Sequence, residues 1–327
     1  MGPFSPTPPL PDFQVDLAQP DISPWIAGNT GIAGITTLDS GAAGRHVALI
    51  SLVHGNEFAG AIVLDRLLRD GIKPVRGRLS LGFANLTAFS RFDPKRPTAS
   101  RFIDEDMNRV WDTAILDGPR RSIELDRARE IRAFVDTVDV LVDLHSMLWP
   151  SEPLILSGSS PKGAALAVGI GAPSLMVADQ GHVNGRRIID YPRFTDPGSA
   201  CAGVLVEAGQ HWAQATVETM MASVVGALRH MTLVAADASL PATPMPSPPR
   251  LARVTTAVTA MTSQFAFVQA YRGGDIVPQR NTLIAMDGET EIRTPYDNCL
   301  LVMPSLRPSR GHTAVRLAQF EVQPPRA

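Results

Sequence analysis

The sequence predicts an α/β fold in which a mixed, mostly parallel β-sheet is flanked by helices and followed by a small C-terminal β-rich domain. Continuous apolar runs, such as residues 46–53 and 138–144, are typical of strands that are buried on both faces. Segments whose apolar residues recur at helical spacing alternate with these runs, as they do in α/β proteins. Beyond a proline-rich stretch at residues 238–250, the pattern changes to short strands separated by turns.

The strands and helices of the α/β part follow one another in a regular order. The first buried run is followed by a segment of helical spacing that ends at Gly71. A long polar stretch, residues 85–119, interrupts the alternation, and long loops in compact domains are often functional. We expect strands at 46–53, 78–84, 138–144, 154–156, 174–178 and 203–207, and helices at 56–70, 122–135, 161–170 and 216–231.

The proline content divides the chain into four parts. Residues 1–25 contain seven prolines, which exclude a regular helix and predict an extended N-terminal arm. Residues 238–250 contain five more and have the composition of a stiff linker. We therefore expect an α/β domain at 26–237, which carries the chemistry, and a β-rich domain at 251–327.

Composition excludes several classes of protein. The chain has 327 residues, of which 44% are hydrophobic, and its two cysteines exclude a disulfide framework and a four-cysteine zinc site. A formal net charge of −2 argues against nucleic acid as a partner, and the sequence has no run of roughly 18 apolar residues that would predict a membrane span. Because the N-terminus lacks the features of a signal peptide, we expect a cytoplasmic protein. Any metal ion must then be held by His, Asp or Glu.

The first candidate for chemistry is the sequence His54-Gly-Asn-Glu57, at the end of the first buried strand. Open α/β sheets place their ligands at the carboxyl ends of strands. His54 and Glu57 are three residues apart, and Gly55 permits a sharp turn between them, so both side chains could reach one metal ion. The alternative is that His54 is a loop or capping residue and Glu57 a first-turn carboxylate favoured by the helix dipole.

The second candidate, Asp143-Leu-His145, ends another buried strand. A chain that leaves the sheet at His145 can turn this side chain into the crevice. His145 would complete a two-histidine, one-carboxylate set with His54 and Glu57, and such a set suits a catalytic zinc ion that keeps one position for water. Asp143 could orient a histidine from behind. The alternative is a structural histidine at a strand end.

The third candidate is Glu207, which follows a further apolar run. A carboxylate at a buried strand end is costly unless it has a function or a partner. As a general base, Glu207 could take a proton from water and then pass it to a leaving amine. The alternative is a glutamate paired with an arginine at the sheet edge. Three strand ends that carry His and Glu side chains together favour one common site.

The long polar stretch contains a fourth candidate, the charged segment 101–109. Arginine guanidinium groups bind carboxylates in bidentate fashion, and asparagine adds orientation. Arg101 and Arg109, with Asn108 beside them, would therefore suit a substrate with one or two carboxylates. The alternative is a solvated run of charges with local ion pairs.

These four motifs together resemble the succinylglutamate desuccinylase/aspartoacylase family, which belongs to the zinc carboxypeptidase-like proteins. Their order and spacing agree with the family over roughly residues 45–230, and a small β-rich tail fits its layout. The resemblance implies one zinc ion per chain, held by His54, Glu57 and His145. It also implies that Glu207 is the catalytic acid and base.

The resemblance further assigns the charged segment. It implies that Arg109, with Asn108, binds a substrate carboxylate, and that Arg101 helps to polarise the scissile acyl carbonyl. Asp106 matches a carboxylate that positions the loop. The family's arginine for an acidic substrate side chain has no motif here, and three arginines in the right segment are candidates: Arg186, Arg187 and Arg193.

The sequence thus predicts a zinc-dependent deacylase that hydrolyses the amide bond of a small, anionic N-acyl amino acid of the N-acetyl or N-succinyl type. The alternatives are a zinc metallocarboxypeptidase acting on short peptides and a non-catalytic ligand-binding member of the fold. No nucleic-acid or membrane partner is expected, and a homo-oligomer is compatible with the sequence.

Several residues outside the motifs have less specific interpretations. His182 and His211 lie in glycine-containing loops near the site segment, where each could contact substrate, although we expect solvated or capping histidines. Tyr296, in the β-rich part, could reach over the site. Cys201 and Cys299 are expected to be unpaired, small apolar residues.

Overall fold

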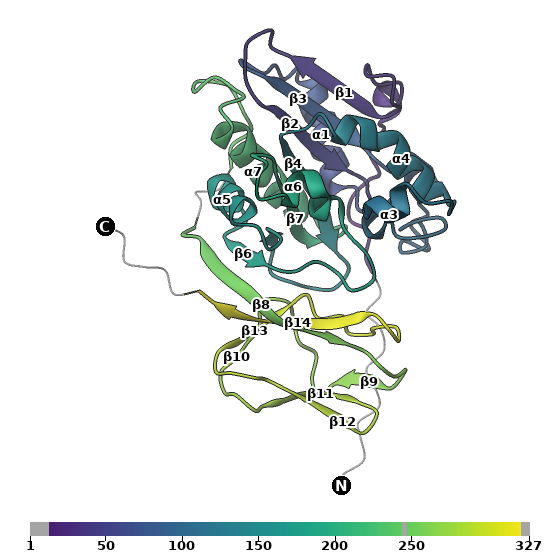
Figure 1. The fold of residues 1–327 in the computed structure, drawn as a ribbon, viewed down its shortest axis with the longest axis vertical. Coiled ribbons are helices and arrows are strands. Elements are labelled where there is room, and N and C mark those ends of the chain that lie inside the picture. Colours follow the sequence, from purple (N-terminus) through teal and green to yellow (C-terminus); the bar gives the residue numbers. More distant parts are fainter. Residues whose placement is uncertain (1–12, 244–246, 322–327) are drawn as a thin grey trace.

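The computed structural model describes residues 13–243 and 247–321. The first half of the predicted N-terminal arm, the middle of the predicted linker (residues 244–246) and residues 322–327 lie outside the described residues. The predicted fold class is confirmed, because helices flank a mixed sheet and a separate small antiparallel sheet lies in the C-terminal region (Figure 1).

The main sheet has 11 strands in the order β1-β3-β2-β4-β7-β5-β6-β8-β14-β13-β10. The four strands β3, β2, β4 and β7 are mutually parallel, whereas β1 and β5 run antiparallel to their inner neighbours. The strands of the α/β part are β1 (Ile35–Asp39), β2 (His46–Ser51), β3 (Arg78–Phe83), β4 (Val140–Met147), β5 (Leu154–Leu156), β6 (Leu175–Ala178) and β7 (Ala202–Gln210).

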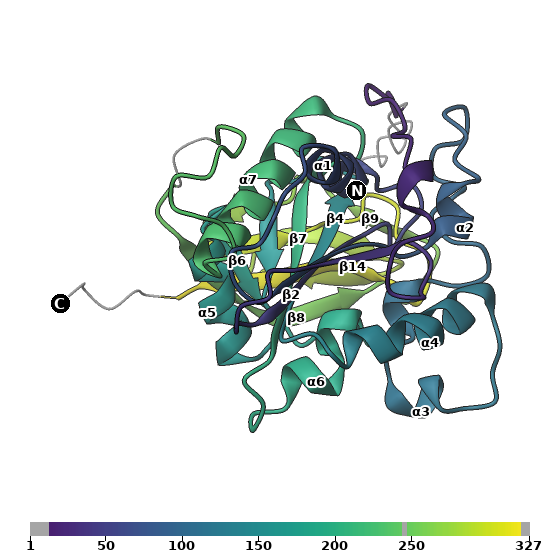
Figure 2. The same cartoon turned by 90° about the horizontal axis from the view of Figure 1, so that it is seen from above.

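Helices cover both faces of this sheet. Figure 2 shows α1 and α7 on one side and α4 and α6 on the other. The helices are α1 (Ala59–Arg69), α2 (Leu86–Phe89), α3 (Thr113–Leu116), α4 (Ile123–Val135), α5 (Pro161–Ile170), α6 (Pro192–Thr195) and α7 (Gln214–His230), with short 3-10 turns η1 (Ser23–Trp25), η2 (Met107–Arg109) and η3 (Ile188–Asp190). Within the described ranges, none of the helices combines the length and the apolarity needed to cross a bilayer.

Local signals explain where the longer helices begin and end. Ser122 caps α4, because its hydroxyl accepts a hydrogen bond from the Leu125 amide at 3.0 Å. Pro161 begins α5, and Gly171, with φ at 75°, ends it in the left-handed conformation that favours glycine. For this reason α5 has the bounds that the sequence predicts.

Two strands are longer than their apolar runs. β4 continues to Met147 and β7 continues to Gln210, so His145 and Glu207 are paired members of the sheet. The expectation that the chain leaves the sheet at His145 is therefore wrong. The ladder continues past the apolar run because the polar side chains at this end are hydrogen-bonded to one another or line a cavity.

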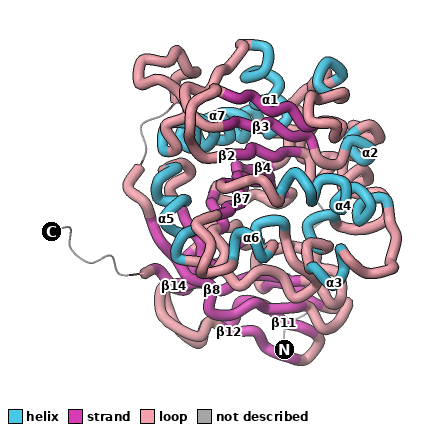
Figure 3. Tube along the Cα trace, turned by 45° about the horizontal axis from the view of Figure 1, so that its top comes forward, coloured by secondary structure: helices cyan, strands magenta, loops and turns pink. Residues whose placement is uncertain are grey.

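The C-terminal strands extend the main sheet across the predicted linker. β8 pairs in parallel with β6, and β14, β13 and β10 follow it in the same sheet (Figure 1). Figure 3 shows β8 and β14 next to each other below the α/β part. β9, β11 and β12 form the separate three-stranded sheet. The predicted domain boundary at 250/251 stays a prediction. The strands of the C-terminal region are β8 (Arg250–Thr259), β9 (Phe265–Phe267), β10 (Ile276–Val277), β11 (Leu283–Asp287), β12 (Thr290–Arg293), β13 (Cys299–Val302) and β14 (Thr313–Phe320).

The described end of the N-terminal arm packs on the α/β part. The Phe13 ring meets the Trp149 and Trp212 rings edge-on, with centroids 5.6 and 6.0 Å apart. Trp25 donates a hydrogen bond of 2.7 Å to Asp65 on α1. Elsewhere, Cys201 and Cys299 are buried and unpaired, as predicted.

Candidate active site

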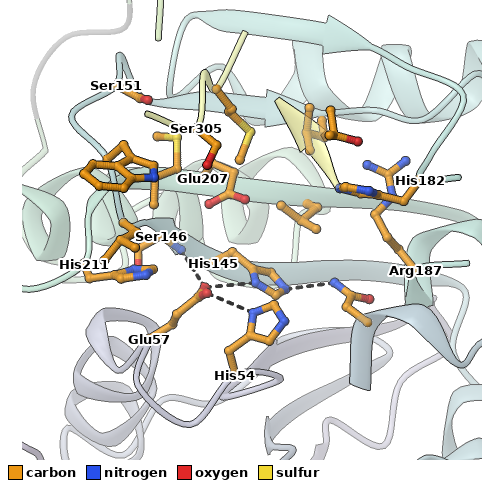
Figure 4. A pocket seen from close by; sticks show the side chains of 18 of the residues that line it. His54, Glu57, His145, Ser146, Ser151, His182, Arg187, Glu207, His211 and Ser305 are labelled. Carbon is orange, nitrogen blue, oxygen red and sulfur yellow. Dashed lines mark hydrogen bonds and ion pairs between the residues drawn. The ribbon is translucent and has the colours of Figure 1, made fainter. Parts of the chain in front are cut away.

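The order of the strands brings the candidate residues together. β2, β4 and β7 are adjacent and parallel, so their carboxyl ends meet at one edge of the sheet. His54 and Glu57 follow β2, while His145 lies on β4 directly opposite Glu207 on β7. Figure 4 shows His54, Glu57 and His145 converging below Glu207.

The side chains of β4 and β7 point into the site because of the strand period. Leu141 and Leu205 pack in the core cluster on the α4 face of the sheet. Asp143 and His145 follow Leu141 at steps of two, and Glu207 follows Leu205 by two, so all three project from the same face. The intervening residues pack in the core on the α1 and α7 side.

Three buried side chains form a group that could hold a metal ion. His54, Glu57 and His145 each offer a ligand atom, and these atoms lie within 4.8 Å of one another. The Glu57 carboxylate lies between the histidines, with Oε1 2.9 Å from His54 Nδ1 and Oε2 3.0 Å from His145 Nδ1.

A second pair of carboxylates orients the two imidazole rings. His54 Nε2 lies 2.9 Å from Asp106 Oδ1, and His145 Nε2 lies 2.8 Å from Asp143 Oδ2. Each ring therefore has its Nε2 against an outer carboxylate and its Nδ1 toward the shared centre. This is the usual arrangement of metal-binding histidines, whose far nitrogen is held by a carboxylate or carbonyl. The contact that the sequence suggested for Asp143 is present.

The charges of the group fit a bound cation. Although burial raises the pKa of Glu57, the adjacent His54 and His145 outweigh it and hold this pKa well below its ordinary value. Burial opposes the protonation of His145, but Asp143 and Glu57 raise its pKa well above the ordinary value. His54 Nδ1 is buried, and its 2.9 Å contact with Glu57 Oε1 is an ion pair without the geometry of a hydrogen bond. The site thus favours a positive charge beside Glu57, and both Nδ1 atoms point toward this carboxylate, so two histidines and a carboxylate fit zinc.

Gly55 allows the loop after β2 to pass close to its neighbours. A Cβ atom at Gly55 would lie 2.4 Å from the Ala88 carbonyl carbon and 2.6 Å from the Ser100 oxygen. The Gly55 amide donates a hydrogen bond of 3.1 Å to the Arg101 carbonyl. The loop that carries His54 and Glu57 is therefore packed directly on the start of the charged segment.

Glu207 lies beside this group, on the strand next to the one that carries His145, and lines the same cavity. Its side chain is buried, and its Oε2 makes no hydrogen bond within the described residues. Burial and the neighbouring Glu57 raise the pKa of Glu207 to about 8. A carboxyl group whose pKa lies near neutrality can both accept and return a proton.

Arg101 reaches the group from the charged segment. Its guanidinium donates to Glu57 Oε1 at 2.7 Å and to Asp106 Oδ2 at 3.4 Å. The segment itself is held by Glu124 on α4, which the sequence analysis did not single out. The buried Glu124 carboxylate accepts hydrogen bonds from the Asn85 amide at 3.1 Å and from three backbone amides at 2.7–3.2 Å, those of Ile103, Asp104 and Glu105.

The side chains of Asn108 and Arg109 differ in how many of their hydrogen-bonding groups already have partners in the protein. The Asn108 side chain donates to Asp143 at 3.1 Å and accepts from the Ile188 amide at 2.8 Å, so the protein engages both ends of it. Arg109 donates to the Asn108 carbonyl at 2.6 Å and lies 3.9 Å from Asp106. Both line the cavity, and their assignment to a substrate carboxylate stays a prediction.

The site opens into a cavity of about 200 Å³. The metal-binding group, Glu207 and the charged segment line it from the α/β part. The C-terminal region contributes the other side, and its lining residues are Met303, Pro304, Ser305, Thr313 and Arg316.

Three side chains lie elsewhere than the sequence suggests. His211 is buried and lines the cavity, and its Nδ1 lies 2.8 Å from the Ser146 hydroxyl, so a solvated or capping role is wrong. Burial lowers the pKa of His211 to about 4. His182 also lines the cavity. Tyr296 does not line it and instead hydrogen-bonds Thr255 at 2.8 Å within the C-terminal region.

Only one of the three candidate arginines lines the cavity. Arg187 lines the cavity and is buried. Arg186 and Arg193 do not line it: Arg186 pairs with Asp112 at 3.0 Å, and Arg193 donates to the Val138 carbonyl at 2.5 Å.

Comparison with known proteins gives one matching family. The family profile of the succinylglutamate desuccinylase/aspartoacylase catalytic domain matches residues 43–182. This range contains His54, Glu57, His145 and the charged segment, whereas Glu207 lies beyond it. A search of the curated proteins found no match.

Solved structures share the fold over most of the chain. Succinylglutamate desuccinylase from Vibrio cholerae is 15% identical with a TM-score of 0.68, covering 88% of this chain and 85% of that chain. A succinylglutamate desuccinylase/aspartoacylase from Rhodobacter sphaeroides is 18% identical with a TM-score of 0.64, covering 88% and 89%. The product-bound ectoine utilization protein from Ruegeria pomeroyi is 17% identical with a TM-score of 0.59, covering 87% and 88%.

The family resemblance predicted from the motifs is therefore confirmed. Residues 43–182 match the catalytic-domain model of the succinylglutamate desuccinylase/aspartoacylase family, and solved structures with names from this family share the fold.

Proposed function

We propose that this chain is a zinc-dependent deacylase that hydrolyses the amide bond of a small N-acyl amino acid, of the N-acetyl or N-succinyl type, to a carboxylate and a free amino acid. One observation carries the proposal: a group of two histidines and a glutamate lies beside the buried Glu207 in one cavity, which Arg101 and Arg109 also line. The matched catalytic domain supports a deacylase of this type.

His54, Glu57 and His145 would hold the zinc ion, one per chain. Zinc bound by such a set acts as a Lewis acid that makes a water molecule more acidic and polarises a carbonyl group. Asp106 and Asp143 keep the two imidazole rings oriented, since each lies against the outer nitrogen of one ring.

Glu207 moves the protons of the reaction. Its free Oε2 accepts a proton from the attacking water, and the same carboxyl group then donates it to the nitrogen of the leaving amine. The C–N bond breaks, the acyl carbon keeps the water oxygen, and Glu207 returns to its ionised form. Its pKa of about 8, raised by burial and Glu57, suits both transfers near neutral pH.

The arginines bind and orient the anionic substrate. Arg101 stands beside the metal-binding group, where its guanidinium can donate to the oxygen of the acyl carbonyl as negative charge develops on it. Arg109, positioned by its bond to the Asn108 carbonyl, binds a carboxylate of the substrate. The cavity, about 200 Å³ and closed on one side by the C-terminal region, is smaller than usual ligand pockets and favours a small molecule over a peptide.

The test combines metal content with a substrate panel. The purified protein is assayed with N-acetyl and N-succinyl amino acids and with short peptides, before and after treatment with a chelator and after addition of zinc. We expect hydrolysis of acyl amino acids that is lost on chelation and restored by zinc. Preferred cleavage of peptides would indicate a carboxypeptidase, and bound zinc without turnover would indicate a ligand-binding protein.

Glu207→Gln isolates the proton-transfer role. We expect kcat to fall by about 10²–10⁴-fold while zinc content is retained, because the amide cannot accept or return the proton. Glu291→Gln, in an exposed ion pair of the C-terminal region, is the matched control. Full activity of Glu207→Gln would contradict the assigned role.

A further inference from the structure

The described end of the N-terminal arm reaches the wall of the cavity. Phe13 is half-buried, and its ring meets the ring of Trp149 edge-on, with centroids 5.6 Å apart. Trp149 in turn lines the cavity. One aromatic contact therefore joins the arm to the site.

The arm is anchored on the α/β part beyond this contact. Leu17 and Ile22 are buried in the core on the α1 and α7 side of the sheet. Between them, the Gln19 side chain donates a hydrogen bond of 2.8 Å to the Phe89 carbonyl. Chain ends hold a defined position only where such contacts tie them down. Because the arm is tied down here, it presents Phe13 to the cavity wall at a defined place.

Phe13 lies against two indole rings. Besides Trp149, it meets Trp212 edge-on, with centroids 6.0 Å apart. Trp212 is fully buried, and its Nε1 donates a hydrogen bond of 3.1 Å to the Asn56 carbonyl, in the loop that carries two of the metal-binding side chains. Trp149 is only half-buried. Since edge-on aromatic pairs are favourable beyond their buried area, Phe13 ties the less buried indole to the fixed one.

Trp149 belongs to an end of the cavity that lacks charge. Figure 4 shows Ser146 and Ser151 on one side of the metal-binding group and His182 on the other. Trp149 lies between the two serines in the chain. We call the side with the serines the neutral end, because the residues of this segment that line it have no charged side chain: Ser146, Met147, Leu148, Trp149 and Ser151.

The place of Arg109 decides which half of the substrate reaches the neutral end. Arg109 lies on the His182 side, since Gly185 pairs with His182 and a Cβ atom at Gly185 would meet the Arg109 carbonyl oxygen at 2.1 Å. In the proposed function, Arg109 binds a carboxylate of the substrate. A substrate with its α-carboxylate at Arg109 and its acyl carbonyl at the metal-binding group directs its acyl chain toward the neutral end.

The neutral end suits a short acyl chain without charge. The carboxylate of a succinyl group would leave water there with no cation of this segment to pair with it, which is costly. A longer apolar chain would meet the Trp149 ring, which Phe13 holds from behind.

We propose that the N-terminal arm limits the length of the acyl group: Phe13 positions Trp149, and Trp149 closes the neutral end to chains longer than acetyl. Phe13 is thus a positioning residue, and Trp149 is the residue that contacts the acyl chain. The proposal rests on the proposed deacylase function and narrows its two acyl types to N-acetyl.

The test compares acyl chains on the same amino acid. N-acetyl, N-butyryl and N-succinyl derivatives are made of L-alanine, L-aspartate and L-lysine, so that the amino-acid half is neutral, acidic or basic. With the zinc-loaded wild type, we expect kcat/KM for the acetyl compound to exceed that for the other two by at least about 10-fold, the effect of about one methylene group. The ratio isolates the acyl end, because a loss of folded protein or of zinc lowers kcat/KM for all three alike.

Three variants test the route from the arm to the acyl chain. Phe13→Ala should lower the acetyl-to-butyryl ratio by about 2- to 10-fold, the equivalent of one edge-on aromatic contact, and Phe13→Leu should retain part of the preference. Trp149→Ala should lower the ratio at least as much as Phe13→Ala. Adding Phe13→Ala to Trp149→Ala should change the ratio no further, because Phe13 acts through Trp149.

Val15→Ala is the matched control. Val15 is a half-buried apolar residue of the same arm that packs on the core and does not line the cavity. We expect this variant to keep the wild-type ratio. The proposal is overturned by a wild type that hydrolyses butyryl or succinyl compounds as well as acetyl ones, by a Phe13→Ala variant that keeps the wild-type ratio, or by a double variant whose ratio falls below that of Trp149→Ala.

Binding to metal-free protein separates this proposal from the proposed function. Calorimetry with the same compounds measures acyl selectivity without turnover. A preference for acetyl compounds that is lost in Phe13→Ala supports the role of the arm even if the zinc-loaded protein hydrolyses nothing, which would contradict the deacylase function alone. The absence of an acyl preference in both assays overturns the proposal. If Phe13→Ala does not fold, Phe13→Leu decides the matter in the same two assays.

Discussion

Replacement of Glu124 by glutamine should weaken both the stability of the protein and the geometry of its site. Glu124 is 0% exposed, and its carboxylate accepts four hydrogen bonds, three of them from backbone amides at the start of the charged segment. Hydrogen bonds to a charged acceptor contribute about 1.5–3 kcal/mol each and neutral ones about half of that. In Glu124→Gln the side-chain NH2 group also replaces one acceptor oxygen and faces at least one N–H donor, so that hydrogen bond is lost. We expect the free energy of unfolding to fall by about 2–4 kcal/mol.

Urea unfolding measures the loss of stability, and steady-state kinetics measure its consequence at the site. The loop held by Glu124 carries Arg101 and Arg109, so kcat/KM for an acyl amino acid should fall while the bound zinc stays stoichiometric. Glu130→Gln is the control, since Glu130 lies on the same helix but is 47% exposed, and it should change the unfolding free energy by less than about 0.5 kcal/mol. If Glu124→Gln unfolds at the wild-type urea concentration with wild-type kinetics, the reasoning is refuted.

Three further predictions concern the metal-binding group and its base. Asp143→Asn should weaken zinc binding by about 10–100-fold, measured by chelator competition, because His145 loses its charged partner; unchanged affinity would contradict this role. As pH is lowered, kcat/KM should decline with an apparent pKa between 4.5, the ordinary value, and about 8, because only ionised Glu207 accepts a proton. Burial and Glu57 raise this pKa toward 8, and a bound cation lowers it. A profile without an acid limb in this range would count against Glu207 as the base. Gly55→Ala should cost about 1–3 kcal/mol in unfolding free energy and reduce zinc content, whereas Gly198→Ala, which meets a movable side chain, should do neither.

The sequence predicts the core elements well because their signals are local. β2, β4 and β7 are continuous apolar runs, and α5 is bounded by a proline and a glycine. The short helices α2 and α3 were missed, since four residues do not establish a helical period. β1 was also missed: it pairs through one edge only, and most of its residues are half-buried, so its apolar pattern is weak.

The metal-binding motifs can also be predicted from the sequence, because a turn or a strand end fixes the relative positions of side chains that are close in sequence. The remaining parts of the site have no such signal. Glu124 lies within an ordinary helix, and its carboxylate resembles any first-turn acidic residue until the loop around it is seen. His211 follows β7 without a motif and enters the cavity because β7 is longer than its apolar run.

By itself, the sequence determined the α/β class, the exclusion of cysteine ligands and the residue set of His54, Glu57, His145 and Glu207. Apolar periodicity, turn residues and motif spacing each involve only a few consecutive residues, so the sequence alone shows them. The tertiary structure decided which strand ends are adjacent and that His145 stays in the sheet opposite Glu207. It also decided that Arg187 donates hydrogen bonds to Asp179, whereas Arg316 lies 3.8 Å from the same carboxylate. These relations depend on the packing of segments more than a hundred residues apart, such as Asp179 against Arg316, and no local pattern encodes them.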